Sequence, residues 1–136
     1  MILCNNTLHK AYDLIAEKMQ LQIPFFHAAD LTAKFAIQHN HKKVLLLATR
    51  FTMEDGFFAK KLEASGLRVE IPEETDREKI QVIQNQLANG DINKLSAHKK
   101  YFEQLIARYQ KIDGIVLACT EFAISNHTRH DHYKNY

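Results

Sequence analysis

The sequence predicts an α/β domain in which a parallel sheet is flanked by helices. Two continuous apolar runs, at 44–49 and 114–119, have the composition of strands that are buried on both faces. The segments between them carry apolar residues three and four positions apart, which is typical of amphipathic helices. Strands that alternate with helices favour parallel pairing, because each helix returns the chain to the same end of the sheet.

Length and composition narrow the class of protein. The chain has 136 residues, of which 46% are hydrophobic, and this is enough for one buried core. Its 18 Lys and Arg against 16 Asp and Glu leave a net charge of +2, without the basic excess of a nucleic-acid binder. No apolar run approaches the roughly 18 residues of a membrane span, and no signal-peptide core follows Met1. We therefore expect a cytoplasmic protein that binds neither nucleic acid nor membrane.

The first part of the chain predicts two helices. Apolar residues at four- and three-residue steps indicate a helix over about 8–20, which Asn6 or Thr7 can cap. A short aromatic stretch with extended preference follows it. Asp30 is then placed to cap a second helix that runs to about residue 38.

The middle of the chain continues the alternation. A helix near 54–64 ends at a Ser-Gly pair before a strand at 67–71. A Thr-x-x-Glu capping box then opens a helix over about 75–90. Ser96 opens a further helix, which precedes the last apolar strand.

Polar side chains follow the carboxyl ends of the predicted strands, of which the earliest is at 2–4. The segments 4–7, 49–52 and 119–121 are rich in thiol, hydroxyl and amide groups. Ligands of parallel sheets bind outside the carboxyl ends of the strands. The sequence therefore predicts one site that these segments build together.

The two cysteines, Cys4 and Cys119, lie at two of these strand ends. In a reducing compartment both are thiols. Cys119 precedes a predicted helix start, where backbone N–H groups stabilise a thiolate, so we expect it to have a lowered pKa and to be alkylated faster than Cys4. The competing interpretation is that Cys119 is a small buried hydrophobe. Two thiols on opposite faces of one carbon can remove and return a proton, which is racemisation without a cofactor.

Three motifs resemble segments of the aspartate/glutamate racemases. Asn-Thr-Leu-His-Lys at 6–10 is similar to the family's Asn-Thr-x-His signature. Leu-Leu-Ala-Thr-Arg-Phe-Thr-Met at 46–53 is similar to its Leu-Gly-Thr-x-x-Thr-Met segment, and Val-Leu-Ala-Cys-Thr-Glu at 116–121 to its Leu-Gly-Cys-Thr-Glu motif. The resemblance covers about 2–124 and keeps the family's order of motifs.

The resemblance implies a two-lobed, pseudo-symmetric α/β enzyme that inverts the α-carbon of a small acidic amino acid. It implies no pyridoxal phosphate or other cofactor. It implies Cys119 as the acid/base of the second lobe, and Cys4 is the other catalytic candidate because of its place at a strand end. The candidates for holding the substrate are Asn5, Asn6, Thr7, Thr49, Thr52 and Thr120. Glu121 is interpreted as a structural residue at a helix start.

The first-lobe catalytic position departs from the family pattern. Aligned on the signature, this position is Asn5, where the family usually has Cys and some members have Thr. An amide does not exchange protons as a thiol does, and Cys4 lies one residue earlier, which on a strand turns it to the opposite face. The resemblance divides the chain into the remnant of a first lobe at 1–40, a second-lobe α/β domain at 41–124 and a flexible tail at 125–136.

The alternative to a racemase is a non-catalytic remnant that only folds or associates. The family's chain normally begins well before the signature, and it ends with a strand and a helix that the tail replaces in this sequence. The resemblance therefore implies a chain truncated at its N-terminus and altered at its C-terminus. We expect the uncovered apolar surface to drive homo-oligomer formation.

Histidines gather at two places in the sequence. These residues are His39, His41, His127, His130 and His132. Neither group has a strong zinc spacing or a cysteine nearby, so we expect no metal site.

Overall fold

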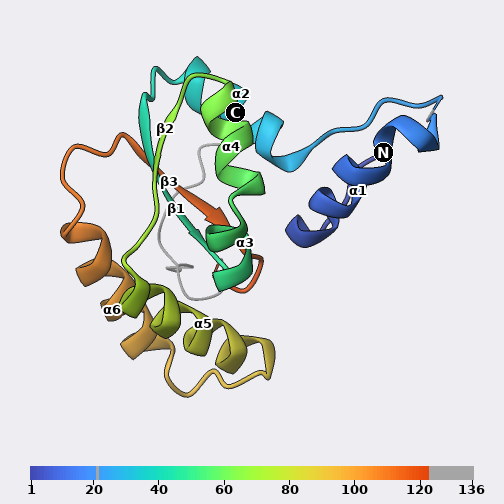
Figure 1. The fold of residues 1–136 in the computed structure, drawn as a ribbon. Coiled ribbons are helices and arrows are strands. Elements are labelled where there is room, and N and C mark those ends of the chain that lie inside the picture. Colours follow the sequence, from blue (N-terminus) through green and yellow to red (C-terminus); the bar gives the residue numbers. More distant parts are fainter. Residues whose placement is uncertain (21, 123–136) are drawn as a thin grey trace.

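The computed structural model describes residues 1–20 and 22–122, and it confirms the predicted α/β class (Figure 1). The elements follow the order α1 (Asn6–Met19), α2 (Ala28–Gln38), β1 (Lys43–Ala48), α3 (Arg50–Asp55), α4 (Phe57–Ala64), β2 (Arg68–Glu70), α5 (Glu74–Ala88), α6 (Leu95–Ala107) and β3 (Gly114–Ala118). The predicted tail at 125–136, with its three histidines, lies outside the described residues.

The three strands form a parallel sheet with the order β2-β1-β3. In the register of the sheet, Val44 lies beside Val69 on one side and Gly114 on the other. From Val44 to Ala48, no residue of β1 is more than 1% exposed, as the continuous apolar run predicts. Because β2 and β3 lie on opposite sides of β1, the direction of winding reverses between β1 and β3. Open α/β sheets bind ligands at such a point.

Helices cover both faces of this sheet. Figure 1 shows α5 and α6 on the opposite side of the strands from α2 and α4. The core between the layers contains Phe58 and Leu62 of α4, Ile80 of α5, and Phe102 and Leu105 of α6, all at most 2% exposed. This packing holds the carboxyl ends of β1 and β3 in fixed positions.

The cap of α1 differs from the prediction. Asn5 is the cap residue, and its Oδ1 accepts the backbone N–H of Leu8 at 3.1 Å. Asn6 and Thr7 belong to the first turn instead. The side chain of Asn6 is thereby left to donate from Nδ2 to the carbonyl oxygen of Ala118 at 2.6 Å, which ties α1 to the end of β3.

Three other predicted helix starts were also wrong. His27 rather than Asp30 caps α2, because its Nδ1 accepts the backbone N–H of Ala29 at 3.1 Å and Asp30 lies inside the first turn. Thr75 lies in the first turn of α5, so it does not form the predicted capping box. Ser96 is the second residue of α6 and makes no cap.

Two helices, α3 and α4, replace the single helix predicted near 54–64. They meet at Gly56, whose φ of 79° is left-handed and therefore suits glycine. Thr49 caps α3 directly after β1, and its Oγ1 accepts the backbone N–H of Thr52 at 3.3 Å. The additional helix thus turns the chain at the end of β1 and brings two threonines together.

The predicted strand at 2–4 does not join the sheet. Ile2 instead forms an isolated parallel bridge with Phe26. The segment is also held by His9, whose ring Nε2 is 3.0 Å from the carbonyl oxygen of Leu3. The start of the chain is therefore tied to its own first helix and to the segment before α2.

Large apolar side chains remain exposed on α1 and β3. Leu14 is 73% exposed, and Ile115 and Leu117 are 41% and 40% exposed. Because side chains alternate along a strand, the two β3 residues share one face, so the prediction that the strand at 114–119 is buried on both faces was wrong for β3. Among the described residues, no helix is both long and apolar enough to cross a bilayer.

Candidate active site

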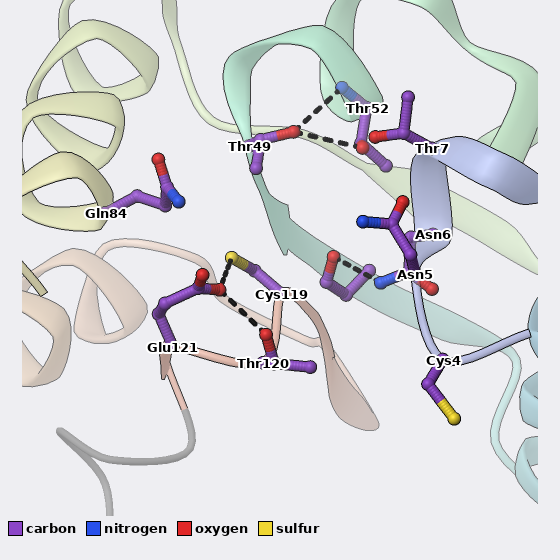
Figure 2. A pocket seen from close by; sticks show the side chains of 11 residues that line it. Cys4, Asn5, Asn6, Thr7, Thr49, Thr52, Gln84, Cys119, Thr120 and Glu121 are labelled. Carbon is purple, nitrogen blue, oxygen red and sulfur yellow. Dashed lines mark hydrogen bonds between the residues drawn. The ribbon is translucent and has the colours of Figure 1, made fainter. Parts of the chain in front are cut away.

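A pocket lies where β1 and β3 end, beside the start of α1 (Figure 2). Its lining includes every residue that the sequence analysis assigned to catalysis or substrate binding. The lining residues are Cys4, Asn5, Asn6, Thr7, Thr49, Thr52, Gln84, Ala118, Cys119, Thr120 and Glu121. Segments from the start, the middle and the end of the described chain therefore meet at one place. The topology of the sheet explains this, because the carboxyl ends of parallel strands share one edge.

Cys119 follows β3 directly and is 8% exposed. Its Sγ donates a hydrogen bond to Oε2 of Glu121 at 2.9 Å. Figure 2 shows the sulfur on the side of the pocket where Glu121 and Gln84 lie. The thiol therefore stands between an apolar strand and an acidic group.

The predicted lowering of the Cys119 pKa was wrong. Burial raises the pKa of this thiol to about 12, and the hydrogen bond to Glu121 acts in the same direction. The backbone N–H groups of Glu121 and Phe122 do lower the pKa, as the sequence predicts, but burial and the carboxylate outweigh them. Cys119 is therefore a protonated thiol at neutral pH.

Glu121 is part of the pocket, which its interpretation as a structural residue missed. The hydrogen bond from Cys119 is the main cause that keeps the pKa of Glu121 below its usual value, against the effect of burial. The hydroxyl of Thr120 also donates to Oε2 of Glu121 at 2.9 Å. An ionised carboxylate and a neutral thiol therefore occupy the same side of the pocket.

Gln84 on α5 was not predicted as a site residue. Its side chain lines the pocket and contributes to the lowered pKa of Glu121. The sequence does contain a signal, because Gln84 follows Ile80 by four residues and precedes Leu87 by three. It thus places a polar side chain within the apolar stripe of α5.

The two thiols do not face each other across the pocket. Cys4 is exposed, and Figure 2 shows its side chain pointing away from Cys119. Asn5, which takes the first-lobe catalytic position in the motif alignment, uses its Oδ1 to cap α1. The described pocket thus has a thiol on the β3 side and amide groups on the α1 side.

Neutral donors supply most of the remaining lining. Thr49 Oγ1 donates to Thr52 Oγ1 at 3.0 Å, and Thr7 lies in the first turn of α1. None of the described residues that line the pocket is Lys or Arg. Hydroxyl and amide groups are therefore what this pocket offers to an anionic ligand.

Within residues 1–20 and 22–122, no group of three His, Cys, Asp or Glu side chains could hold a metal ion. The rings of His39 and His41 lie 6.2 Å apart between centroids, away from the pocket lining. The three tail histidines lie outside the described residues.

Comparison with known proteins gives consistent matches. A family model described as Asp/Glu/hydantoin racemase matches residues 1–134. A putative Asp/Glu racemase from Yersinia pestis is 37% identical with a TM-score of 0.76, and it aligns over 90% of this chain. An aspartate racemase homologue from Pyrococcus horikoshii OT3 is 29% identical with a TM-score of 0.72, over 91% of this chain. The fold is also similar to that of the Picrophilus torridus aspartate racemase, at 24% identity and a TM-score of 0.68, over 91% of this chain.

The chain spans about half the length of these structures. It covers 54% of the first two chains and 50% of the third. The family match over residues 1–134 includes every residue that lines the pocket.

Proposed function

The chain belongs to the Asp/Glu/hydantoin racemase family, and on this basis we propose that its pocket is the Cys119 side of a cofactor-independent amino-acid racemase site. The observation that carries the proposal is the convergence of three distant motif segments around one buried thiol. The substrate we propose is a small acidic amino acid, aspartate or glutamate. A reducing cytoplasm, which the sequence predicts, would keep Cys119 as the thiol that this chemistry needs.

Racemisation requires that the α-hydrogen leave one face of the carbon and that a proton return to the other face. Cys119 can serve one face: its thiolate takes the α-proton to become a thiol, or its thiol gives its proton to the carbanion. The hydroxyl of Thr52, which accepts the hydrogen of Thr49, has its own hydrogen available to donate to a carboxylate of the substrate.

The opposite face lacks an equivalent group in the described pocket. Asn5 presents an amide, and the Cys4 thiol points away from Cys119. A missing proton-transfer group typically costs about 10² to 10⁴ in rate. We therefore expect slow interconversion of the enantiomers. The same observation favours a second candidate function, a non-catalytic family member that only folds or associates.

Solvent-deuterium exchange at the α-carbon separates these two functions. The D and L enantiomers of aspartate and glutamate are incubated separately with the protein in D₂O and followed by NMR. A working Cys119 takes the α-proton through the small fraction of thiolate that it holds at neutral pH, and it exchanges one enantiomer faster than it interconverts the pair. Cys119→Ser should abolish this exchange, whereas Cys4→Ser should leave it unchanged.

Exchange that persists in Cys119→Ser would refute the assignment of Cys119. Absence of exchange with all four amino acids would favour the non-catalytic function. Rapid interconversion that needs both cysteines would show that Cys4 reaches the substrate.

A further inference from the structure

His9 belongs to the first of the three sequence motifs, but it does not line the pocket. Its side chain is 0% exposed, whereas the other residues of α1 are exposed or half-buried. Burial of a polar ring costs free energy unless the ring is hydrogen-bonded. A buried imidazole on such a helix therefore indicates a specific role for its hydrogen bond.

This hydrogen bond joins α1 to the segment that precedes it. The ring Nε2 of His9 is 3.0 Å from the carbonyl oxygen of Leu3. Because a carbonyl oxygen can only accept, Nε2 must carry the ring proton. The other ring nitrogen, Nδ1, is buried and has no hydrogen-bond partner among the described residues. The contact with Leu3 is therefore the polar contact that the described structure gives this ring.

Aromatic neighbours hold the ring of His9 in place. Its centroid is 5.5 Å from that of Phe25 and 4.3 Å from that of His27. His27 is itself fixed, because it is 3% exposed and its Nδ1 accepts the backbone N–H of Ala29 at the start of α2. The ring of His9 is thus packed between α1 and the residues before α2, with little freedom to turn.

A fixed Leu3 carbonyl sets the course of the chain into the pocket. This carbonyl and the N–H of Cys4 belong to one planar peptide unit, so its direction also fixes how the chain reaches Asn5. We propose that His9 is a positioning residue for the α1 side of the pocket, which holds Leu3 and thereby keeps Asn5 at the pocket. This inference rests on the proposed function and deepens it, because it assigns how the α1 side of the substrate site is set.

Two backbone N–H groups flank this contact and can report on it. The N–H of Phe26 donates to the carbonyl oxygen of Met1 at 2.9 Å, and the N–H of Leu8 donates to Oδ1 of Asn5 at 3.1 Å. Since neither bond belongs to the three-stranded sheet, both N–H groups can exchange with solvent when the segment opens locally, without unfolding of the core. Their hydrogen-exchange rates therefore measure how firmly His9 holds the segment.

The test compares two substitutions of His9 with one matched control. His9→Gln retains a side-chain N–H donor, whereas His9→Phe keeps a ring and removes the donor. The control is His98→Phe on α6, because His98 is 6% exposed, its Nε2 is 3.0 Å from Oε1 of Gln86, and its Nδ1 also has no partner among the described residues. Nitrogen NMR of the imidazoles at about pH 8, above their ordinary pKa, identifies the protonated ring nitrogen, and amide hydrogen exchange is followed on the same samples.

In the unsubstituted protein we expect the ring proton of His9 on Nε2. In His9→Phe the N–H groups of Leu8 and Phe26 should exchange about 2- to 10-fold faster, the size of one lost hydrogen bond, and those of β1 should change less. His9→Gln should restore most of this protection. His98→Phe should not accelerate Leu8 and Phe26 more than β1.

The α-proton exchange of aspartate or glutamate provides a second readout, which distinguishes positioning from a merely structural role. A displaced α1 side should bind the amino acid more weakly, so His9→Phe should raise KM by about 2- to 10-fold with a smaller change in kcat. A merely structural role would reduce the amount of folded protein, which lowers the apparent kcat and leaves KM unchanged.

A ring proton on Nδ1 of His9 would overturn the proposal, and this measurement needs no variant if His9→Phe does not fold. Equal acceleration of Leu8, Phe26 and β1 in His9→Phe would also overturn it, as would an unchanged KM or identical behaviour of His9→Gln and His9→Phe. If no amino acid undergoes exchange, the proposed function fails, whereas the ring proton and the amide rates still decide whether His9 holds the segment.

Discussion

Brief alkylation of the native protein should label Cys4 faster than Cys119. Cys4 is exposed, whereas Cys119 is 8% exposed and donates its hydrogen to Glu121. This order is the reverse of the one expected from the sequence. The sequence shows the helix-start amides that stabilise a thiolate, but it does not show the burial and the carboxylate that destabilise it.

The size of the effect follows from the pKa of Cys119, which rises from 9.0 to about 12. Three units lower the thiolate fraction at neutral pH by about 10³. A thiolate of higher pKa is also more nucleophilic, by about 15- to 30-fold over three units. The acidity alone should therefore slow alkylation of Cys119 by about 30- to 60-fold relative to an ordinary thiol, and its burial slows it further.

The measurement is a time course with iodoacetamide at neutral pH, followed by digestion and mass spectrometry of the two cysteine peptides. Single variants Cys4→Ser and Cys119→Ser confirm the peptide assignments. Labelling in 6 M guanidinium chloride provides the reference in which both thiols are unfolded, and there we expect comparable rates. Native labelling of Cys119 at or above the rate of Cys4 would refute the conclusion that burial and Glu121 suppress its thiolate.

Three further predictions concern the other parts of the molecule. Asn5→Cys adds a proton-transfer group and should therefore speed the interconversion of D- and L-aspartate by about 10² or more. The same change removes the cap of α1 and should lower the free energy of unfolding by about 1 kcal/mol. An unchanged rate of interconversion would exclude position 5 from the second face of the substrate. Hydrogen bonds from Arg108 and Tyr101 outweigh burial and lower the pKa of Asp76, so Asp76 stabilises the fold above its unfolded pKa near 3.8 and the stabilisation is lost as pH falls below it. Asp76→Asn should lower the free energy of unfolding at pH 7 by about 1.5–3 kcal/mol and flatten its acid dependence in urea titrations, and an unaltered acid limb would contradict the assignment. The exposed apolar side chains of α1 and β3 should drive self-association, which Leu14→Lys should weaken, and a concentration-independent monomer in light scattering would contradict it.

The sequence predicted β1 well because a strand that is buried on both faces has a clear apolar pattern, whereas the strand expected at 2–4 did not join the sheet and one face of β3 is exposed. A run of apolar residues such as 44–48 has no polar alternative, and the structure buries all of it. The convergence of Cys119 and Thr49 on one pocket follows from the same pattern, because both residues come directly after parallel strands. The apolar pattern does not determine which of several adjacent polar residues caps a helix and which one lines the pocket.

The start of α1 shows why that choice needs the tertiary structure. Asn5, Asn6 and Thr7 are all good caps, and their local propensities barely differ. The hydrogen bond of Asn6 to Ala118, more than 100 residues away in sequence, draws Asn6 into the pocket and leaves the cap to Asn5. The direction of the Cys119 pKa shift also depends on the tertiary structure. Burial raises the pKa of this thiol and the backbone amides lower it, and the sequence shows only the amides.

The two sides of the pocket are held by different kinds of contact. Cys119 follows β3, which pairs with β1 along its whole length, so its backbone is fixed by the sheet. Cys4 and Asn5 follow a segment that has one isolated bridge at Ile2, and the hydrogen bond from Asn6 is what ties the start of α1 to β3. A proton-transfer group must stay within about 0.5 Å of its productive position to be effective. The α1 side therefore lacks both the chemical group and the sheet pairing that the β3 side has, so a second thiol at position 5 can restore the chemistry only while the Asn6 tether holds.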